Sequence, residues 1–375
     1  MILRLLALFF LVFSLGCARH PASKRIVAAG DNDAVRKVQD QGLDSSRHYP
    51  GGRSGVWTGP KLAGVPSIKW TVSVPGPVVY PLILADGDVF AIAGGSLFKI
   101  TASGSILWET KVLADGPIAW DDGRILVPTV SGTMHSIDAE TGKFAASYAG
   151  FESIRSPALP LGGRKAWIER DGILLTKDSQ NGPILTGPVS DAASDSSRFF
   201  VGNIHGIAAA VSEAGLQWSS RVDGPVTGQP IVAGDVVYFP YGPNSKGRGG
   251  IAAFGRQDGQ LIWNTAFGPG VSAPCALGDV LIVPSRDSDL VALDPKHGGT
   301  RWRSPIPTPI SSKPLLVDDA IYVGDGDGRV RRYDVEDGGS VWSIELGSAI
   351  TGDGVILDGL LIVGTADGRI IGLAE

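Results

Sequence analysis

The sequence predicts an all-β protein, and three observations predict it. First, 52 of the 375 residues are Gly and 25 are Pro, so turns must be frequent and long windows free of helix breakers are scarce. Second, a Trp or another apolar residue follows a Gly-containing turn at intervals of 33 to 45 residues, as in GSILW, GQLIW and GSVW. Third, an Asp/Gly turn followed by a β-branched run, as in ADGDVFAI and LGDVLIVP, keeps step with the first marker.

The repeating unit is about 40 residues long and contains four short runs of alternating apolar and polar residues. One such sheet cannot bury both of its faces alone, and a closed ring lets each sheet cover its neighbour. The markers predict an eight-bladed β-propeller of four-stranded antiparallel blades. The last unit ends after its third strand, RIIGLAE, whereas the run Ser67–Ser73 precedes the first complete unit. We therefore expect this N-terminal strand to complete the last blade and close the ring.

A Trp occupies the same place in six of the units. A large aromatic side chain at that place is expected to fill the wedge between two twisted sheets, since burial of one contributes several kcal/mol. Phe144 and Leu185 stand at the corresponding places of two degenerate units and are expected to fill the wedge less completely. The predicted blade-docking residues are Trp70, Trp108, Trp218, Trp263, Trp302 and Trp342.

The N-terminus is typical of an export signal. Residues 1–16 combine one positive charge with the apolar run Leu5–Leu15, which is too short for the ~20 residues that a transmembrane helix needs. The segment FSLGC, which ends at Cys17, resembles a bacterial lipoprotein signal, and the resemblance implies that Cys17 becomes the lipidated first residue of the mature chain. The alternative is ordinary secretion with an incidental Cys. Several acyl chains on one Cys would hold a domain at a membrane.

Charge and composition divide the rest of the chain into two parts. Residues 17–52 show no strand alternation and are predicted to be a polar linker, and residues 53–375 form the propeller. Residues 18–53 carry seven Lys/Arg and four Asp/Glu, whereas residues 54–375 carry 25 and 34, so a basic linker precedes an acidic body. The overall net charge of −5 gives no indication of nucleic-acid binding. Apart from Cys17 the only Cys is Cys275, which we expect to be a buried, inert thiol.

The repeat resembles that of the quinoprotein propellers, whose unit reads G-x-L-x-A-L-D-x-x-x-G-x-x-x-W. The segments DSDLVALDPKHGGTRW and GDGDGRVRRYDVEDGGSVW carry the resemblance, which extends over Ser67–Glu375. One branch of this family comprises dehydrogenases that depend on pyrroloquinoline quinone (PQQ). The other comprises non-catalytic propellers, including the lipoproteins of the outer-membrane β-barrel assembly machinery. The resemblance specifies the fold much more strongly than the function.

The catalytic branch implies features that this sequence lacks. Its soluble alcohol enzymes use a Cys-Cys pair, and here Cys275 stands alone between Pro274 and Ala276. No His pair has metal-ligand spacing, and Asp325-Gly326-Asp327-Gly328 lacks the later ligands of a calcium loop and is interpreted as a hairpin turn. We therefore predict no catalytic residues, no metal site and no cofactor. The alternative is a quinoprotein-like enzyme or sensor that binds PQQ with Ca²⁺, or a small ligand, in the central funnel.

Two basic features could contact partners. The inserted loop at residues 241–250, YGPNSKGRGG, offers Lys246 and Arg248 as a candidate partner loop. Arginines also gather in the sixth and seventh blades, either to meet an acidic partner or to keep sheet edges apart in solvent. Those arginines are Arg301, Arg303, Arg329, Arg331 and Arg332.

The sequence thus favours a non-enzymatic, monomeric scaffold for protein–protein interaction. By resemblance its partners are envelope proteins, the barrel-assembly machinery among them. The same resemblance, with Ala18 after Cys17, implies a lipid anchor in the outer membrane and a propeller in the periplasm.

Overall fold

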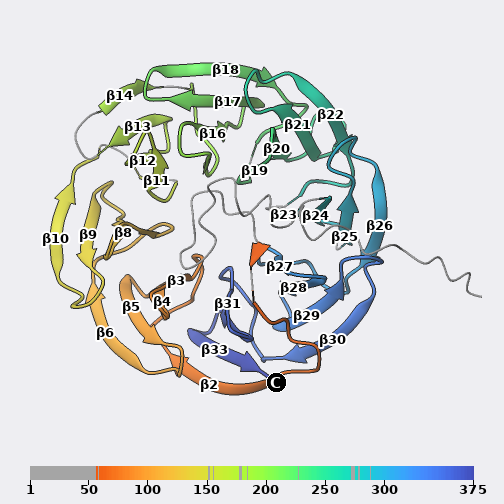
Figure 1. The fold of residues 1–375 in the computed structure, drawn as a ribbon. Coiled ribbons are helices and arrows are strands. Elements are labelled where there is room, and N and C mark those ends of the chain that lie inside the picture. Colours follow the sequence, from red (N-terminus) through yellow and green to blue (C-terminus); the bar gives the residue numbers. More distant parts are fainter. Residues whose placement is uncertain are drawn as a thin grey trace, which may run out of the picture.

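A computed structural model of the protein describes residues 56–375 except 58, 151–152, 155, 177–179, 184, 227, 272–274, 278 and 288. The predicted signal peptide, Cys17 and the predicted linker lie outside these residues. Every regular element of the described chain is a β-strand. The strands form eight sheets that surround a common centre, each with four mutually antiparallel strands (Figure 1). The predicted eight-bladed propeller is confirmed.

The first four blades follow one another in chain order, each from its innermost to its outermost strand. Blade 1 comprises β3 (Ile83–Ala85), β4 (Asp88–Ala93), β5 (Ser96–Thr101) and β6 (Ile106–Lys111). Blade 2 comprises β7 (Ala119–Trp120), β8 (Arg124–Pro128), β9 (Met134–Asp138) and β10 (Phe144–Tyr148). Blade 3 comprises β11 (Leu159–Leu161), β12 (Arg164–Ile168), β13 (Ile173–Thr176) and β14 (Gln180–Pro183). Blade 4 comprises β15 (Ala193–Ser194), β16 (Phe199–Gly202), β17 (Ile207–Ser212) and β18 (Gly215–Arg221).

The other four blades include the two N-terminal strands, β1 and β2. Blade 5 comprises β19 (Ile231–Ala233), β20 (Val236–Tyr241), β21 (Gly250–Gly255) and β22 (Leu261–Ala266). Blade 6 comprises β23 (Cys275–Leu277), β24 (Val280–Ser285), β25 (Asp289–Leu293) and β26 (Thr300–Pro305). Blade 7 comprises β27 (Leu315–Val317), β28 (Ala320–Gly324), β29 (Arg329–Asp334) and β30 (Ser340–Glu345), with β1 (Val56–Trp57) added inside β27. Blade 8 comprises β31 (Val355–Leu357), β32 (Leu360–Gly364), β33 (Arg369–Ala374) and β2 (Ser67–Ser73).

The repeated Asp/Gly turns join the first two strands of a blade. Asp86, Asp318 and Asp358 have positive φ angles of about 50°, the left-handed conformation that a two-residue hairpin turn requires and that Asp tolerates better than most residues. The β-branched run after each turn forms the second strand, which is almost entirely buried, as in β24 and β28. The Asp/Gly marker in the sequence is therefore a hairpin turn, followed by a strand whose two faces both pack against neighbouring blades.

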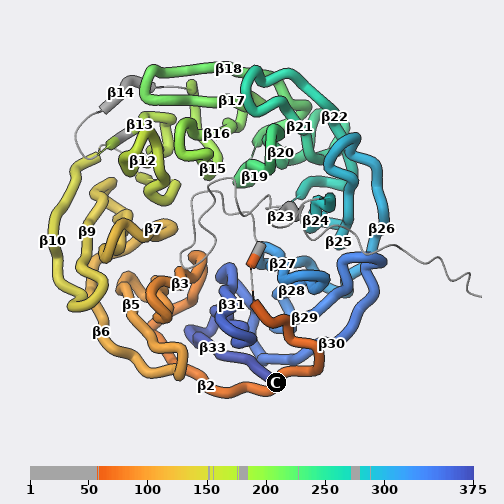
Figure 2. The backbone as a smooth tube through the Cα atoms, viewed as in Figure 1, coloured from red at the N-terminus to blue at the C-terminus, as the bar shows by residue number. Residues whose placement is uncertain are grey.

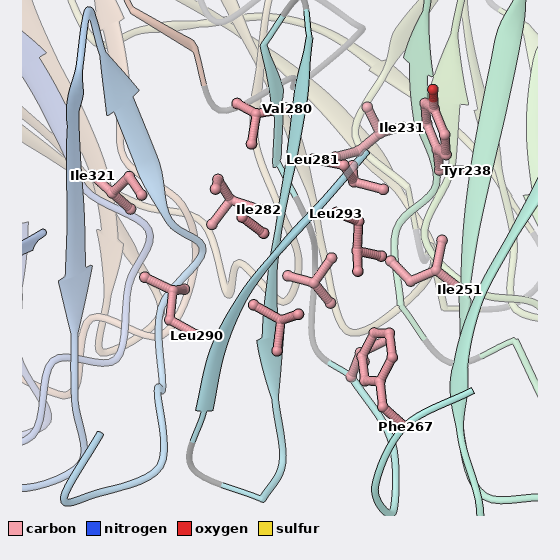
Figure 3. Close-up of a cluster of buried hydrophobic side chains, with 14 of the residues drawn as sticks. Ile231, Tyr238, Ile251, Phe267, Val280, Leu281, Ile282, Leu290, Leu293 and Ile321 are labelled. Carbon is pink, nitrogen blue, oxygen red and sulfur yellow. The ribbon is translucent and has the colours of Figure 1, made fainter. Parts of the chain in front are cut away.

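The core lies between the blades. One large cluster joins blades 5, 6 and 7 and includes Tyr238, Ile251, Phe267, Ile282 and Ile321. Figure 3 shows these side chains filling the space between neighbouring sheets. Because every sheet packs against two others, both faces of the inner strands are apolar, which produces the continuous apolar runs in the sequence.

The ring is closed by β2, as predicted. This strand pairs antiparallel with β33, in a register from Ser67 opposite Ala374 to Ser73 opposite Arg369. The N-terminal strand thus supplies the fourth strand of blade 8. Figure 2 shows the chain running from the centre of the ring to the rim before it enters β2. No helix in the described part of the chain is long and apolar enough to cross a membrane.

Candidate interaction site

The six predicted Trp residues lie on outermost strands, where each blade meets the next one. In five of these contacts the indole Nε1 donates a hydrogen bond to a carbonyl oxygen in the turn before the fourth strand of the next blade. The pairs are Trp70 to Ala102 (2.8 Å), Trp108 to Glu140 (3.1 Å), Trp218 to Arg256 (3.1 Å), Trp263 to Pro295 (2.9 Å) and Trp302 to Val335 (2.9 Å).

A Gly in the same turn lies against the face of the indole. A Cβ added to Gly338 would lie 2.5 Å from Trp302, and Gly142, Gly259 and Gly298 are as tightly placed against their own Trp neighbours. Gly338 also has a φ of +72°. These positions require Gly for both reasons, because a side chain there would collide with the ring and strain the backbone.

The seam between blades 7 and 8 is built differently. Blade 8 has no turn before its fourth strand, because β2 arrives from the other end of the chain. The carbonyl oxygen of Leu62 takes the place of the turn and accepts the Nε1 hydrogen bond of Trp342 at 3.4 Å. Leu62 is buried, and its own N–H donates to the Tyr322 hydroxyl at 2.7 Å. Residues 61–64, which we call the closing segment, thus complete the last seam.

Ionic and polar contacts hold the closing segment on both sides. Lys61 pairs with Asp319, and this hydrogen bond outweighs the partial burial of Asp319 and lowers the pKa of its carboxyl. Arg332 donates from Nη1 to the carbonyl oxygen of Ala63 at 3.1 Å. Gly64 donates from its N–H to the side chain of Glu375 at 2.8 Å, which joins the two ends of the propeller.

The expectation for Phe144 is wrong. In β5 and β6 a bulge separates the pair Ile100–Ile106 from the pair Lys99–Trp108, and in β9 and β10 the corresponding pairs are Ile137–Phe144 and Ser136–Ala146. Ala146, and not Phe144, therefore stands at the place of the Trp. Phe144 corresponds to Ile106 and is 53% exposed, with its ring edge against His135.

The seam between blades 2 and 3 is filled from its other side. Trp167 on β12 is 1% exposed and packs 6.0 Å, centroid to centroid, from Tyr148 on β10. Sequence reasoning missed this residue because it lies on a second strand and outside the Trp repeat. Leu185 is buried, in a cluster that joins blades 3 and 4 and contains Phe199. It does not stand at the Trp place, however, because β14 ends with Pro183 opposite Ile173 and Leu185 follows the end of that strand.

Acidic or carbonyl groups of the protein itself engage the arginines of blades 6 and 7. Arg331 Nε contacts the buried carboxylate of Asp325 at 2.9 Å, and Arg332 holds Ala63. Burial would lower the pKa of Arg301, but its bonds to two carboxylates raise it overall. This arrangement favours the interpretation that these charges cover strand edges. The remaining pairs are Arg301 with Asp279 and Asp294, Arg303 with Asp289, and Arg329 with Glu345.

The candidate partner loop is a compact hairpin between β20 and β21. The side chain of Asn244 accepts from the backbone N–H groups of Lys246 (2.9 Å) and Arg248 (3.2 Å), which folds the loop tip around it. Arg248 Nη2 donates to the carbonyl oxygen of Ala266 at the end of β22 (2.9 Å). Both basic side chains are exposed and have no acidic partner within 4 Å among the described residues. The loop therefore presents net positive charge at the outer edge of blade 5.

The segment Asp325–Gly328 is a hairpin turn between β28 and β29. The Asp325 carboxylate is buried and accepts from the backbone N–H groups of Asp327 (3.1 Å) and Arg329 (2.8 Å), so it satisfies the turn itself. Among the described residues no group of three or more His, Cys, Asp and Glu side chains gathers at metal-binding distance. The side chain of Cys275 lies outside what the structure describes.

The centre of the ring contains part of the N-terminal chain. Strand β1 pairs in parallel with the inner edge of β27, with Val56 opposite Leu316 and Trp57 opposite Val317, and it also contacts β23 (Figure 1). A ligand in the central funnel would share this space with β1.

These features define a closed eight-bladed propeller of the quinoprotein type, in which a Trp on one blade docks on a Gly turn of the next. The sequence matches the family described as outer membrane protein assembly factor BamB over residues 93–185 and 247–374. The chain therefore belongs to this family.

Solved structures show the same fold at low sequence identity. BamB from Moraxella catarrhalis is 19% identical, with a TM-score of 0.69 over 83% of this chain and all of the other. The computationally designed Ika8 protein is 14% identical, with a TM-score of 0.71 over 81% of this chain and 98% of the other. No curated protein matches the sequence significantly.

Proposed function

We propose that this protein is a non-enzymatic scaffold of the bacterial envelope that takes part in outer-membrane protein assembly by binding other proteins. The observation that carries the proposal is the family match, which covers both halves of the propeller. The structure supports it with a ring whose seams are hydrogen-bonded and whose closing segment joins the two ends of the domain. A rigid ring of this kind presents its loops and outer strands at fixed positions.

The proposal includes the predicted anchor. Acylated Cys17 would hold the protein at the outer membrane, and the predicted linker would carry the propeller into the periplasm. Replacement of Cys17 by Ser tests this part. We expect the variant to leave the membrane fraction and to appear in the soluble periplasmic fraction at unchanged size after signal removal. Retention of the Cys17→Ser variant in the membrane fraction would contradict lipid anchoring.

The role itself is tested by affinity purification from detergent-solubilised membranes with the anchor intact. We expect subunits of the barrel-assembly machinery to co-purify. Their absence, together with recovery of other envelope proteins, would keep a scaffold but remove the assembly role. The competing function, a PQQ-dependent or small-ligand-binding quinoprotein, is tested by calorimetric titration with PQQ and Ca²⁺. Saturable binding accompanied by dye reduction would overturn the scaffold proposal.

A further inference from the structure

The outermost strands of the eight blades occupy equivalent positions in the fold, but their side chains differ. At the two positions before each docking Trp, blade 5 carries Leu261 and Ile262, whose exposed fractions are 57% and 48%. In blade 6 the same register positions carry Thr300 and Arg301. Since blade 6 forms the same strand with polar side chains, the fold does not require apolar residues there. Blade 1 carries the similarly exposed Ile106 and Leu107 at these positions, so the apolar pair distinguishes blade 5 only in combination with the other features of its outer edge.

The outer edge of blade 5 also lacks the charges that usually protect sheet edges. Strand β22 has the sequence LIWNTA, without a charged residue, whereas β26 has TRWRSP, with two arginines and a terminal Pro. Edge strands of soluble proteins are commonly protected by charge or Pro, because their outward backbone groups are a template for another strand. Strand β22 is the end of its sheet and is open in this sense.

The candidate partner loop lies at the far end of the same edge. Arg248 donates to the carbonyl oxygen of Ala266, the last residue of β22, and Lys246 projects from the loop tip. At this end of the blade, Asp223 accepts from the side-chain amide of Asn264 at 2.8 Å, and the Asp287 carboxylate lies beside Gly268. Along the ~14 Å from Ile262 to Ala266, the edge therefore changes from apolar to positively charged.

We propose that the outer edge of blade 5 binds an extended segment of a partner protein, which adds to β22 as an antiparallel strand. Apolar side chains of the segment would cover Leu261 and Ile262, and an acidic residue would meet Lys246 and Arg248. Because the added strand runs antiparallel, the acidic residue precedes the apolar ones by about four residues in the partner sequence. Backbone hydrogen bonds to β22 would supply affinity. The apolar end and the basic end of the edge would fix the orientation of the bound segment.

The extent of the edge favours a partner segment over a second copy of this chain. A six-residue strand is ~20 Å long, and contacts along one edge of that length fall well short of the ~1,200 Å² that stable protein interfaces bury. If two copies met edge to edge, the interface would contain Lys246 and Arg248 from both chains, and the second copy would bring no acidic residue on β22 to pair with them. An acidic, apolar segment is complementary in both respects.

The inference rests on the proposed function only in taking the partner to be an exported protein, and its test is made on the purified propeller alone. The probe is a fluorescein-labelled peptide, EETSTVTV, followed by fluorescence anisotropy. The double variant Leu261→Thr/Ile262→Arg gives β22 the side chains that β26 already carries, so the fold accommodates it. We expect it to weaken peptide binding by roughly tenfold or more with an unchanged melting temperature.

Two controls decide the interpretation. The variant Ile106→Thr/Leu107→Arg makes the same change on β6 and is expected to leave binding unaltered. A peptide with Lys in place of both Glu residues is expected to bind about tenfold more weakly, and Lys246→Gln is expected to remove much of that difference.

Equal loss of peptide binding in the β6 and β22 variants, or no loss in either, would overturn the proposal. Dimerisation of the wild type that the β22 variant abolishes would also overturn it and assign the edge to a second copy. Peptide binding without recovery of assembly subunits from membranes would retain this site and remove only the assembly role.

Discussion

Truncation of Trp302 to Ala should destabilise the propeller at the seam between blades 6 and 7. A Trp side chain buries ~150–250 Å² when enclosed, so this partly buried indole covers about 120 Å², worth ~3 kcal/mol at ~25 cal/mol per Å². The hydrogen bond from Trp302 Nε1 to the carbonyl oxygen of Val335 contributes about 1 kcal/mol more. The expected loss in the free energy of unfolding is therefore about 4 kcal/mol.

Differential scanning calorimetry measures this loss as a fall in melting temperature. At ~2 °C per kcal/mol for a domain of this size, Trp302→Ala should melt about 8 °C below the wild type. Trp302→Phe keeps most of the apolar contact but loses the donor, so its fall should be about half as large. Phe144→Ala is the matched control, because Phe144 is more than half exposed and does not stand at the Trp place of its strand. A fall for Trp302→Ala no larger than that for Phe144→Ala would refute the docking argument.

Two further changes test the seams in other ways. Gly338→Ala places a methyl group 2.5 Å from Trp302, whereas Gly123→Ala has the same positive φ but open space around it, so the first should lower the melting temperature several degrees more than the second. If both variants lose the same number of degrees in melting temperature, backbone strain alone accounts for the Gly at position 338. The pairing with Lys61 lowers the pKa of Asp319, so its contribution is complete above the unfolded-state pKa of ~3.9 and is lost as pH falls through the lower folded-state value. Melting temperatures measured from pH 6 to 3 should therefore fall less steeply for Asp319→Asn, and a parallel fall would contradict the role of this pair.

The blade count and the closing strand followed from the sequence because the information that specifies them is local. Turns that need left-handed residues recur in each unit, as at Asp86 and Asp318, and a strand that lacks a partner at one end of the chain is matched by a gap at the other. The Trp positions were found for the same reason. Five of the six dock on a turn whose Gly is a fixed feature of the repeat, and Trp342 docks on the closing segment instead.

Register and long-range contacts were not available from the sequence. Phe144 was assigned to the docking place because it is the large apolar residue that follows the Gly turn of its unit. The bulge lies between Phe144 and Ala146, however, and the sequence alone does not show that Ala146 takes the place of the Trp. The closing segment lies within residues 53–375, which were predicted to form the propeller, but the sequence indicated no role for it. Its role depends on contacts such as Leu62 with Trp342, 280 positions apart, which no local pattern reports.

The repeat itself separates what the fold needs from what it does not. A feature present in nearly every blade, such as the Trp on its Gly turn, is explained by packing. In blade 2, which lacks the Trp, the seam with blade 3 is filled by Trp167 instead. A feature confined to one blade has no such explanation, because the other blades form the same sheet without it. Blade 5 alone combines an uncharged outer strand, two exposed apolar side chains before its Trp and an inserted basic loop at the strand end. In a quasi-symmetric ring such a coincidence on one edge is the strongest indication of where a partner binds.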